Sequence, residues 1–209
     1  PIDYMIALSA SVSFLEDKLF FEKIKEQFPN IKIFVSADYA LDLKLLKENI
    51  IAAVDGYLLD FTSADIYEYI GDNNLANLTD LLIAEKLKDI NFELGNRKKI
   101  IKNYSMPQPQ HFLFDTKKYR YPFNRFGYCR GLLASFGCPY NCSYCVSARL
   151  PYKIRALDEI LTEIENIRSY NINELHFDDQ TFLTEHSQDN AIAIANHLIK
   201  TNYRGGWVC

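Results

Sequence analysis

The chain has 209 residues, of which 48% are hydrophobic and 24% charged, with a formal net charge of −4. This composition is typical of a globular protein, and its slightly acidic balance gives no electrostatic reason to expect nucleic acid as a partner. No apolar stretch approaches the roughly 20 residues that span a bilayer, and no secretion signal is visible. Three of the five cysteines fall within eight positions. That clustering suggests a metal site in a reducing compartment, so we expect a cytoplasmic protein.

Strand and helix patterns alternate through the first 60 residues. Short apolar runs predict strands over 4–8, 31–35 and 56–59, with helices over 14–28 and 41–49 between them. In the first helix, apolar residues recur at helical spacing opposite a charged face: Leu15, Leu19, Phe20 and Ile24. Strands separated by helices of this length imply right-handed βαβ units and a parallel sheet.

The middle of the chain contains the predicted domain boundary. A further helix is predicted over 75–88, followed by a hairpin turn over 92–97 and a strand over 99–102. The polar stretch 105–110 contains two prolines and few helix formers, which makes it the best linker in the chain. The aromatic run 119–123 is expected to pack this linker onto its neighbours. We therefore expect a domain over 1–104, a linker over 105–126 and a second domain over 127–209.

A second α/β series begins near Gly127. Strands are predicted over 131–135, 174–177 and 206–208, and apolar residues at helical spacing mark helices around 160–167 and 191–198. A loop with three cysteines follows the first of these strands and precedes a helix. In parallel α/β folds, sites form at the carboxyl ends of strands, so the cysteines lie where chemistry is usually built.

The cysteine loop runs from Gly137 to Cys145, and Cys138, Cys142 and Cys145 follow the spacing C-x3-C-x2-C. Thiolates are soft ligands that select iron–sulfur clusters or zinc. A four-iron cluster normally takes four cysteine ligands, so three from one loop would leave one iron open. An open iron is where a substrate or cofactor binds, and it favours a catalytic site.

Two other interpretations of the loop stay open. A structural zinc site needs a fourth ligand, which Cys129, Cys209 or His176 could supply, although the chain has no second C-x-x-C pair. Alternatively, the three cysteines are buried and inert. Against this, Pro139 and Asn141 indicate a tight loop rather than a core strand.

The cysteine spacing, with an aromatic Tyr144 before the last cysteine, resembles the signature of the radical S-adenosylmethionine superfamily. Residues 132–137 resemble the first barrel strand of that family, and the similarity extends over roughly 127–209. The resemblance implies a four-iron, four-sulfur cluster held by Cys138, Cys142 and Cys145. It also implies that S-adenosylmethionine chelates the open iron, with Tyr144 among the cofactor-binding residues.

The same resemblance implies a reaction. One electron from the reduced cluster cleaves the sulfonium and yields a 5′-deoxyadenosyl radical, which abstracts hydrogen from a substrate. An electron donor such as a flavodoxin or ferredoxin is then needed. The substrate stays unknown, and methylation, cyclisation and rearrangement all remain open.

Residues 176–182 resemble the Phe-x-Asp-Asp-x-Phe type of segment in a family branch with an N-terminal cobalamin-type domain. By position, the segment replaces a motif that contacts the amino group of S-adenosylmethionine. Asp178 and Asp179 are therefore predicted to bind the cofactor, because a carboxylate accepts hydrogen bonds from an ammonium; either could instead cap the following turn. His176 is expected to be a core histidine. Cys129 is expected to be a buried, unreactive strand cysteine. Arg149 and Arg155 could pair with a carboxylate of the cofactor or anchor the loop, and we favour the structural role. No catalytic residue for the substrate step is predicted.

The first domain resembles the later part of a cobalamin-binding domain. The implied fold is therefore a partial Rossmann-like parallel sheet followed by the first half of a partial (β/α) TIM barrel. Three departures disfavour cobalamin. The cobalt-ligating Asp-x-His-x-x-Gly motif does not occur, residues 36–38 replace a glycine pair, and residues 60–63 replace a glycine-containing turn. Only three of about six barrel strands fit before Cys209, so we expect a chain truncated at both ends.

Two rival functions belong to other classes. One is a non-catalytic iron–sulfur or zinc protein that keeps the loop for structure or electron transfer. The other is a paralogue that binds a partner and has lost its chemistry.

Overall fold

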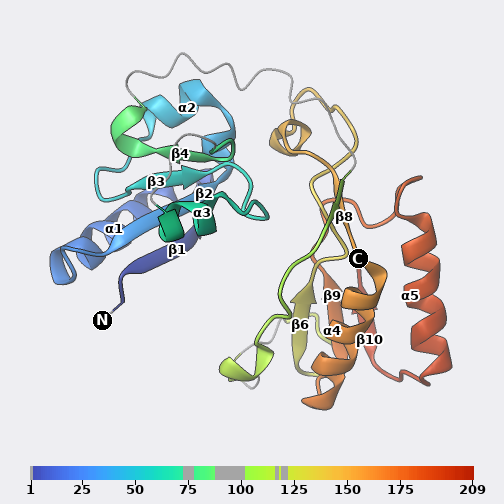
Figure 1. Cartoon of the computed structure of the whole chain (residues 1–209). Helices are drawn as coiled ribbons and strands as arrows, with labels where there is room; N and C mark the ends of the chain where they lie inside the picture. The colour runs from blue at the N-terminus through green and yellow to red at the C-terminus, as the bar shows by residue number, and fades with distance from the viewer. Residues whose placement is uncertain (1, 73–77, 88–101, 116–117, 119–121) are drawn as a thin grey trace. The chain divides into compact units, whose positions relative to one another are not determined.

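The computed structural model of the chain describes residues 2–72, 78–87, 102–115, 118 and 122–209. The chain forms two compact units, Pro1–Arg97 and Lys98–Cys209 (Figure 1). Both contain strands and helices in alternation, which confirms the α/β class. Within the described residues, no helix is long and apolar enough to cross a membrane.

The first unit is built on one sheet with the strand order β1-β2-β3-β4. Its strands are β1 (Tyr4–Ser9), β2 (Lys32–Ala37), β3 (Gly56–Leu58) and β4 (Leu81–Ile83). Its helices are α1 (Phe14–Gln27), α2 (Leu43–Glu48) and α3 (Asp65–Asp72). The first three strands pair in parallel, which confirms the predicted βαβ series. The core lies at β2, where Ile33, Phe34 and Val35 are fully buried.

The helix predicted over 75–88 is wrong where the structure describes it. Residues 81–83 form β4, antiparallel to β3, and residues 84–86 form a short 3-10 helix. Leu81 packs into a cluster with Phe34, Leu58 and Ile66, so backbone pairing with β3 and burial outweigh local helical periodicity. Residues 75–77 and 88 lie outside the described residues, as do the predicted hairpin over 92–97 and the first three residues of the strand predicted over 99–102.

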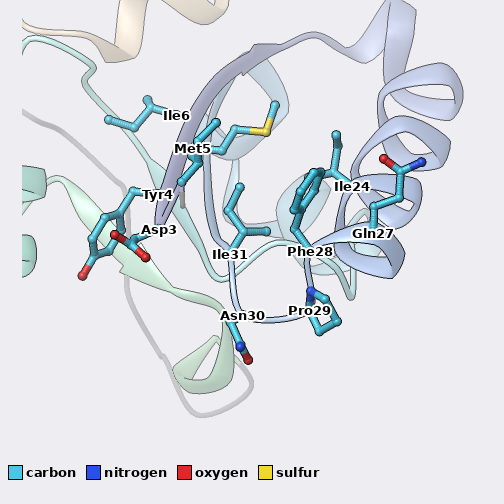
Figure 2. Close-up of a pocket in the computed structure, with 11 residues that line it drawn as sticks. Asp3, Tyr4, Met5, Ile6, Ile24, Gln27, Phe28, Pro29, Asn30 and Ile31 are labelled. Atoms are coloured by element: carbon cyan, nitrogen blue, oxygen red, sulfur yellow. The ribbon is translucent and has the colours of Figure 1, made fainter.

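Helix α1 and strand β1 leave apolar surface exposed. Among the described residues of α1, Phe21 is buried, whereas Leu15, Leu19 and Phe20 are exposed although the periodicity singled them out. β1 is the edge strand of the described sheet, so α1 has less sheet to cover than a central crossover helix. A pocket of about 710 Å³ opens between the start of β1 and the end of α1 (Figure 2).

The second unit contains a three-stranded parallel sheet in the order β10-β9-β6. Its strands are β6 (Cys129–Leu132), β9 (Glu174–Phe177) and β10 (Gly206–Val208), joined by α4 (Leu157–Ser169) and α5 (Gln188–Lys200). Within this sheet, the three strands lie side by side in chain order. Leu132, Leu175 and Phe177 share a core cluster with residues of both helices, so α4 and α5 cover the same face.

A second small sheet has the order β5-β8-β7, with β5 (Lys102–Tyr104), β7 (Ser135–Phe136) and β8 (Lys153–Arg155). The strand predicted over 131–135 is therefore divided, because β6 ends at Leu132 and β7 joins a different sheet. The cysteine loop also does not lead directly into a helix. A 3-10 helix, Val146–Arg149, and β8 precede α4.

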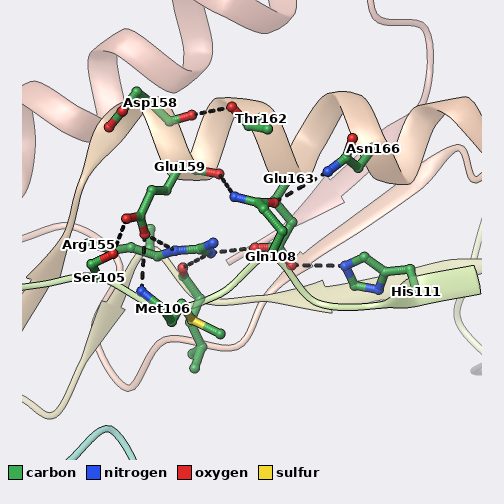
Figure 3. A network of polar contacts seen from close by, with 12 residues as sticks. Ser105, Met106, Gln108, His111, Arg155, Asp158, Glu159, Thr162, Glu163 and Asn166 are labelled. Atoms are coloured by element: carbon green, nitrogen blue, oxygen red, sulfur yellow. Dashed lines mark hydrogen bonds and ion pairs between the residues drawn. The ribbon is translucent and has the colours of Figure 1, made fainter. Parts of the chain in front are cut away.

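Residues 105–111, part of the predicted linker, lie against α4 in a polar network (Figure 3). Ser105 and the backbone N–H of Met106 donate to Glu159. His111 contacts the buried carboxylate of Glu163 at 2.9 Å. Side-chain hydrogen bonds thus hold this segment against α4.

Arg155 is the buried centre of this network. Its guanidinium forms ion pairs with Glu159 and Glu163 and donates to the carbonyl of Leu133 at 3.3 Å. Because Leu133 lies just before β7 and Arg155 ends β8, these bonds join the two strands that flank the cysteine loop. The prediction that Arg155 is structural is confirmed, and Arg149 lies in the 3-10 helix that leaves the loop.

Candidate functional site

The cysteine loop begins at a glycine that the backbone requires. Gly137 has a φ of +76°, and a β-carbon there would overlap the carbonyl oxygen of Pro151. Only glycine adopts this conformation without strain and also fits the space. The chain therefore turns sharply out of β7 into Cys138, and a turn closed by the Cys145 N–H on the Cys142 carbonyl ends the loop.

None of the three loop cysteines forms a disulfide, and Cys142 is exposed whereas Cys138 and Cys145 are half-buried. Within the part of the chain that the structure describes, no three histidine, cysteine or acidic side chains are gathered tightly enough to hold a metal ion. The donor set nevertheless fits a soft metal or cluster, because three accessible thiols lie on one short loop. Binding would require the loop to close around the metal.

Tyr144 projects from this loop into solvent with 90% of its surface exposed. A hydrogen bond with the Cys142 side chain raises the pKa of its phenol. The structure therefore places Tyr144 beside one of the predicted ligands.

The segment after β9 holds the start of the cysteine loop through three consecutive side chains. Asp179 accepts hydrogen bonds from the backbone N–H of Ala134 at 3.1 Å and from both the N–H and the hydroxyl of Ser135. Two further contacts continue along the loop: the Gly137 N–H donates to Gln180 Oε1 at 3.0 Å, and Cys138 Sγ lies 3.2 Å from Thr181 Oγ1. We call Asp179, Gln180 and Thr181 the loop clamp.

The two aspartates that sequence reasoning could not separate have different surroundings. Burial raises the pKa of Asp179, although the hydrogen bonds from Ser135 and Ala134 oppose it. Asp178 is exposed, and partial desolvation of its carboxyl raises its pKa while the charge of His176 opposes that rise. A β-carbon on residue 131 would overlap Asp178 Oδ2, so Asp178 lies over Gly131 of the neighbouring strand. Asp179 is hydrogen-bonded to Ala134 and Ser135 at the entry to the cysteine loop, whereas Asp178 is exposed at the surface.

The possible fourth ligands lie in different places. Cys129 is buried at the start of β6, so it sits at the opposite end of this strand from the cysteine loop. The prediction of a buried strand cysteine is confirmed. His176 is also buried, in β9, 3.4 Å from Glu174. Cys209 is exposed and directly follows β10.

The carboxyl edge of the first sheet contains the side chains that replace the expected glycines. Asp38, after β2, accepts hydrogen bonds from the N–H and hydroxyl of Ser11, at 2.7 and 3.0 Å. Asp60, after β3, is buried and accepts from the N–H and hydroxyl of Thr62. The bonds of Asp38 join the loops after β1 and β2, whereas those of Asp60 lie within the loop after β3.

Sequence reasoning missed the loop clamp residues Gln180 and Thr181, and it missed Gly131. The available signal was a run of polar side chains directly after a buried strand, at the edge where sites form. The need for glycine at 131 had no local signal, because it comes from a carboxylate 47 positions away in the chain.

No protein-family model matches the chain, and no curated protein matches it. Two solved structures of the radical S-adenosylmethionine methyltransferase TsrM from Kitasatospora setae share its fold. One, with tryptophan and the analogue aza-SAM bound, has a TM-score of 0.61 at 15% identity and covers 95% of this chain and 40% of its own. The other, with cobalamin and a [4Fe-4S] cluster bound, has a TM-score of 0.61 at 13% identity, covering 95% and 41%. The predicted resemblance is thus confirmed at the level of fold, and the chain spans about two fifths of these proteins.

Proposed function

We propose that the protein is a radical S-adenosylmethionine enzyme whose iron–sulfur cluster is held by Cys138, Cys142 and Cys145. The observation that carries this proposal is the loop clamp: side chains from the end of β9 hold the beginning of a loop that presents three cysteines without disulfides. The fold shared with TsrM supports it, because cysteine spacing and fold point to the same chemistry.

The strand order of the second unit supports the architecture in this proposal. In the second unit, each strand lies beside the next in chain order with both helices on one face, which is the arrangement of a (β/α) barrel rather than of a doubly wound sheet. We assign 127–209 to the first half of a partial barrel and the first unit to a cobalamin-type Rossmann-like domain. The boundary expected at 104 falls earlier in the chain, because β5 (Lys102–Tyr104) pairs with β8 in the second unit.

Each residue of the site has a distinct role. The three thiolates would hold the cluster, which when bound supplies the electron that cleaves the sulfonium of S-adenosylmethionine. Asp178 would accept hydrogen bonds from the ammonium group of S-adenosylmethionine, because its carboxyl is exposed and a charge-assisted bond is strong. Asp179 would keep the loop in place. Tyr144, beside Cys142, would contact the cofactor.

Both solved structures are of a methyltransferase, so methyl transfer is the first substrate reaction to test here. The proposal does not require cobalamin. Asp38 and Asp60 place hydrogen-bonded carboxylates where the family has glycines, and these side chains hinder close approach of a ligand to the backbone.

The test is anaerobic reconstitution of the chain with iron and sulfide, followed by electron paramagnetic resonance of the reduced protein with and without S-adenosylmethionine. A four-iron signal that shifts when S-adenosylmethionine is added supports the proposal. A signal indifferent to S-adenosylmethionine, or zinc bound in place of iron, would assign the protein to the non-catalytic class.

A further inference from the structure

The face of β9 opposite α4 and α5 carries a column of ionisable side chains. Leu175 and Phe177 point to the helices, and side chains alternate along a strand. Glu174 and His176 therefore lie on the other face, and both are buried. Asp178 continues this alternation directly after the strand.

Residues of the segment before β6 contact Glu174 and His176. The backbone N–H of Phe126 donates to Glu174 Oε2 at 2.9 Å, and the other carboxyl oxygen, Oε1, lies 3.4 Å from His176 Nε2. The ring of Phe123 stacks on the imidazole, with centroids 6.0 Å apart and planes 15° from parallel. The imidazole is thus fixed at one nitrogen and at one face.

The third member, Asp178, lies over Gly131, the register partner of His176. Gly131 and His176 are direct partners in the register of β6 and β9, so their backbones lie about 4.8 Å apart. The Asp178 carboxyl occupies the space that a side chain on residue 131 would fill. The Asp178 carboxyl therefore covers Gly131, the residue that pairs with His176 on the neighbouring strand.

We propose that His176 is a positioning residue: held by Glu174 and Phe123, its imidazole lies beside the Asp178 carboxyl across Gly131 and keeps that group a carboxylate, turned toward an incoming ammonium. The electrostatic effect of His176 on Asp178 has the sign that this role requires. The inference rests on the proposed function, because it gives Asp178 the S-adenosylmethionine ammonium as its ligand.

Other titratable or charged groups lie in the surroundings of Glu174. Cys129 is the register partner of Glu174, and Arg125 lies with its guanidinium over the ring of Phe126. Tyr203 packs against the core cluster on the helix side of the sheet and donates to the carbonyl of Gly206. Burial raises its pKa to about 12, with the charge of Arg168 opposing the rise and that of Glu174 adding to it. Besides burial, the charge of His176 is the effect that acts on the pKa of Asp178, so a variant at His176 tests that effect.

The experiment is a pH titration of the cluster-free full chain labelled with 13C at aspartate carboxyl carbons, with Asp178→Asn used to assign the resonance. In His176→Gln, the titration midpoint of Asp178 should be higher than in the wild type, since the neutral amide no longer favours the carboxylate. His197→Gln, which removes an imidazole paired with Glu165 on α4, is the matched control and should leave the midpoint unchanged. An unchanged midpoint in His176→Gln, or an equal change in the control, would overturn the proposal.

A second measurement does not depend on the folding of His176→Gln. In the wild-type chain, the imidazole Cε1–H resonance of His176 should shift over the pH range in which Asp178 titrates, and Asp178→Asn should remove that step. If the step is missing in the wild type, the two groups are not coupled and the inference fails. Because no cluster or S-adenosylmethionine is present, this result stands apart from the resonance test of the proposed function.

Discussion

The carboxylate of Asp179 accepts hydrogen bonds from both the backbone N–H and the hydroxyl of Ser135. These bonds join the end of β9 to the strand that leads into the cysteine loop. In Asp179→Ala, buried donors lose their acceptor, so we expect the free energy of unfolding to fall by about 1–3 kcal/mol. Urea denaturation followed by circular dichroism measures this. Asp178→Ala is the control, because it removes an exposed carboxylate and should change stability by less than about 0.5 kcal/mol; equal losses in both variants would contradict the assigned roles.

Each of the three loop cysteines should be indispensable for the cluster. Replacing Cys138, Cys142 or Cys145 by alanine removes one of the three protein ligands, so iron and sulfide contents after anaerobic reconstitution should fall to background. Cys129→Ala should keep the full cluster, since this thiol lies at the far end of β6. Cys209→Ser tests the remaining alternative, and loss of the cluster in that variant would indicate a fourth protein ligand.

Gly131→Ala should weaken binding of S-adenosylmethionine without removing the cluster. The added methyl group would overlap Asp178 Oδ2 and displace the carboxyl. A hydrogen bond between charged partners contributes about 1.5–3 kcal/mol, so the dissociation constant should rise by about tenfold or more. Gly71→Ala is the matched control, because a β-carbon there meets nothing within 4 Å. Unchanged affinity in Gly131→Ala would show that Asp178 does not contact the cofactor.

The buried pair of Arg155 and Glu163 should be sensitive to removal of either partner alone. Arg155→Met removes the guanidinium from the buried Glu163 carboxylate, which keeps its ion pair with His111. Removing one partner of a buried pair costs about 3–5 kcal/mol. The double variant Arg155→Met with Glu163→Leu removes both charges and should recover part of this loss in the same urea experiment. A double variant as unstable as the sum of the two single changes would rule out this explanation.

Stability at acid pH should depend on Glu159. A hydrogen bond from the Ser105 hydroxyl is the main cause that lowers the pKa of this carboxyl below its ordinary value of 4.5, with further hydrogen bonds from Met106 and Arg155 and partial opposition from burial. A carboxyl whose pKa is lower in the folded state stabilises the fold above its unfolded pKa, and this contribution is lost as the pH falls through the folded pKa.

Unfolding in urea between pH 6 and pH 3 tests that dependence. The acid loss of stability should be smaller in Glu159→Gln than in the wild type, whereas Glu185→Gln, at a residue whose side chain is 83% exposed, should follow the wild type. Identical pH profiles for wild type and Glu159→Gln would exclude this source of acid sensitivity.

Sequence and structure agree where a pattern is local and strong. The strands at β1, β2, β3, β9 and β10 and the helices α1, α4 and α5 lie where apolar periodicity predicts them. Disagreement arises at β4, where three residues pair with β3 and fill a cluster with Phe34 and Leu58. A three-residue strand has too short a pattern to identify it, and only the neighbouring strand supplies its hydrogen bonds.

The sequence by itself determined the chemistry that this protein offers. The spacing of Cys138, Cys142 and Cys145 and the acidic pair after a buried strand are local features, and they predicted both the donor set and the edge of the sheet. Only the tertiary structure decided how the acidic pair is divided. Asp179 accepts hydrogen bonds from the backbone N–H groups of Ala134 and Ser135, and Asp178 lies over Gly131, the register partner of His176. The physical reason is that a carboxylate's role depends on the groups around it. Here the donors to Asp179 and the glycine beneath Asp178 lie more than 40 positions away in the chain.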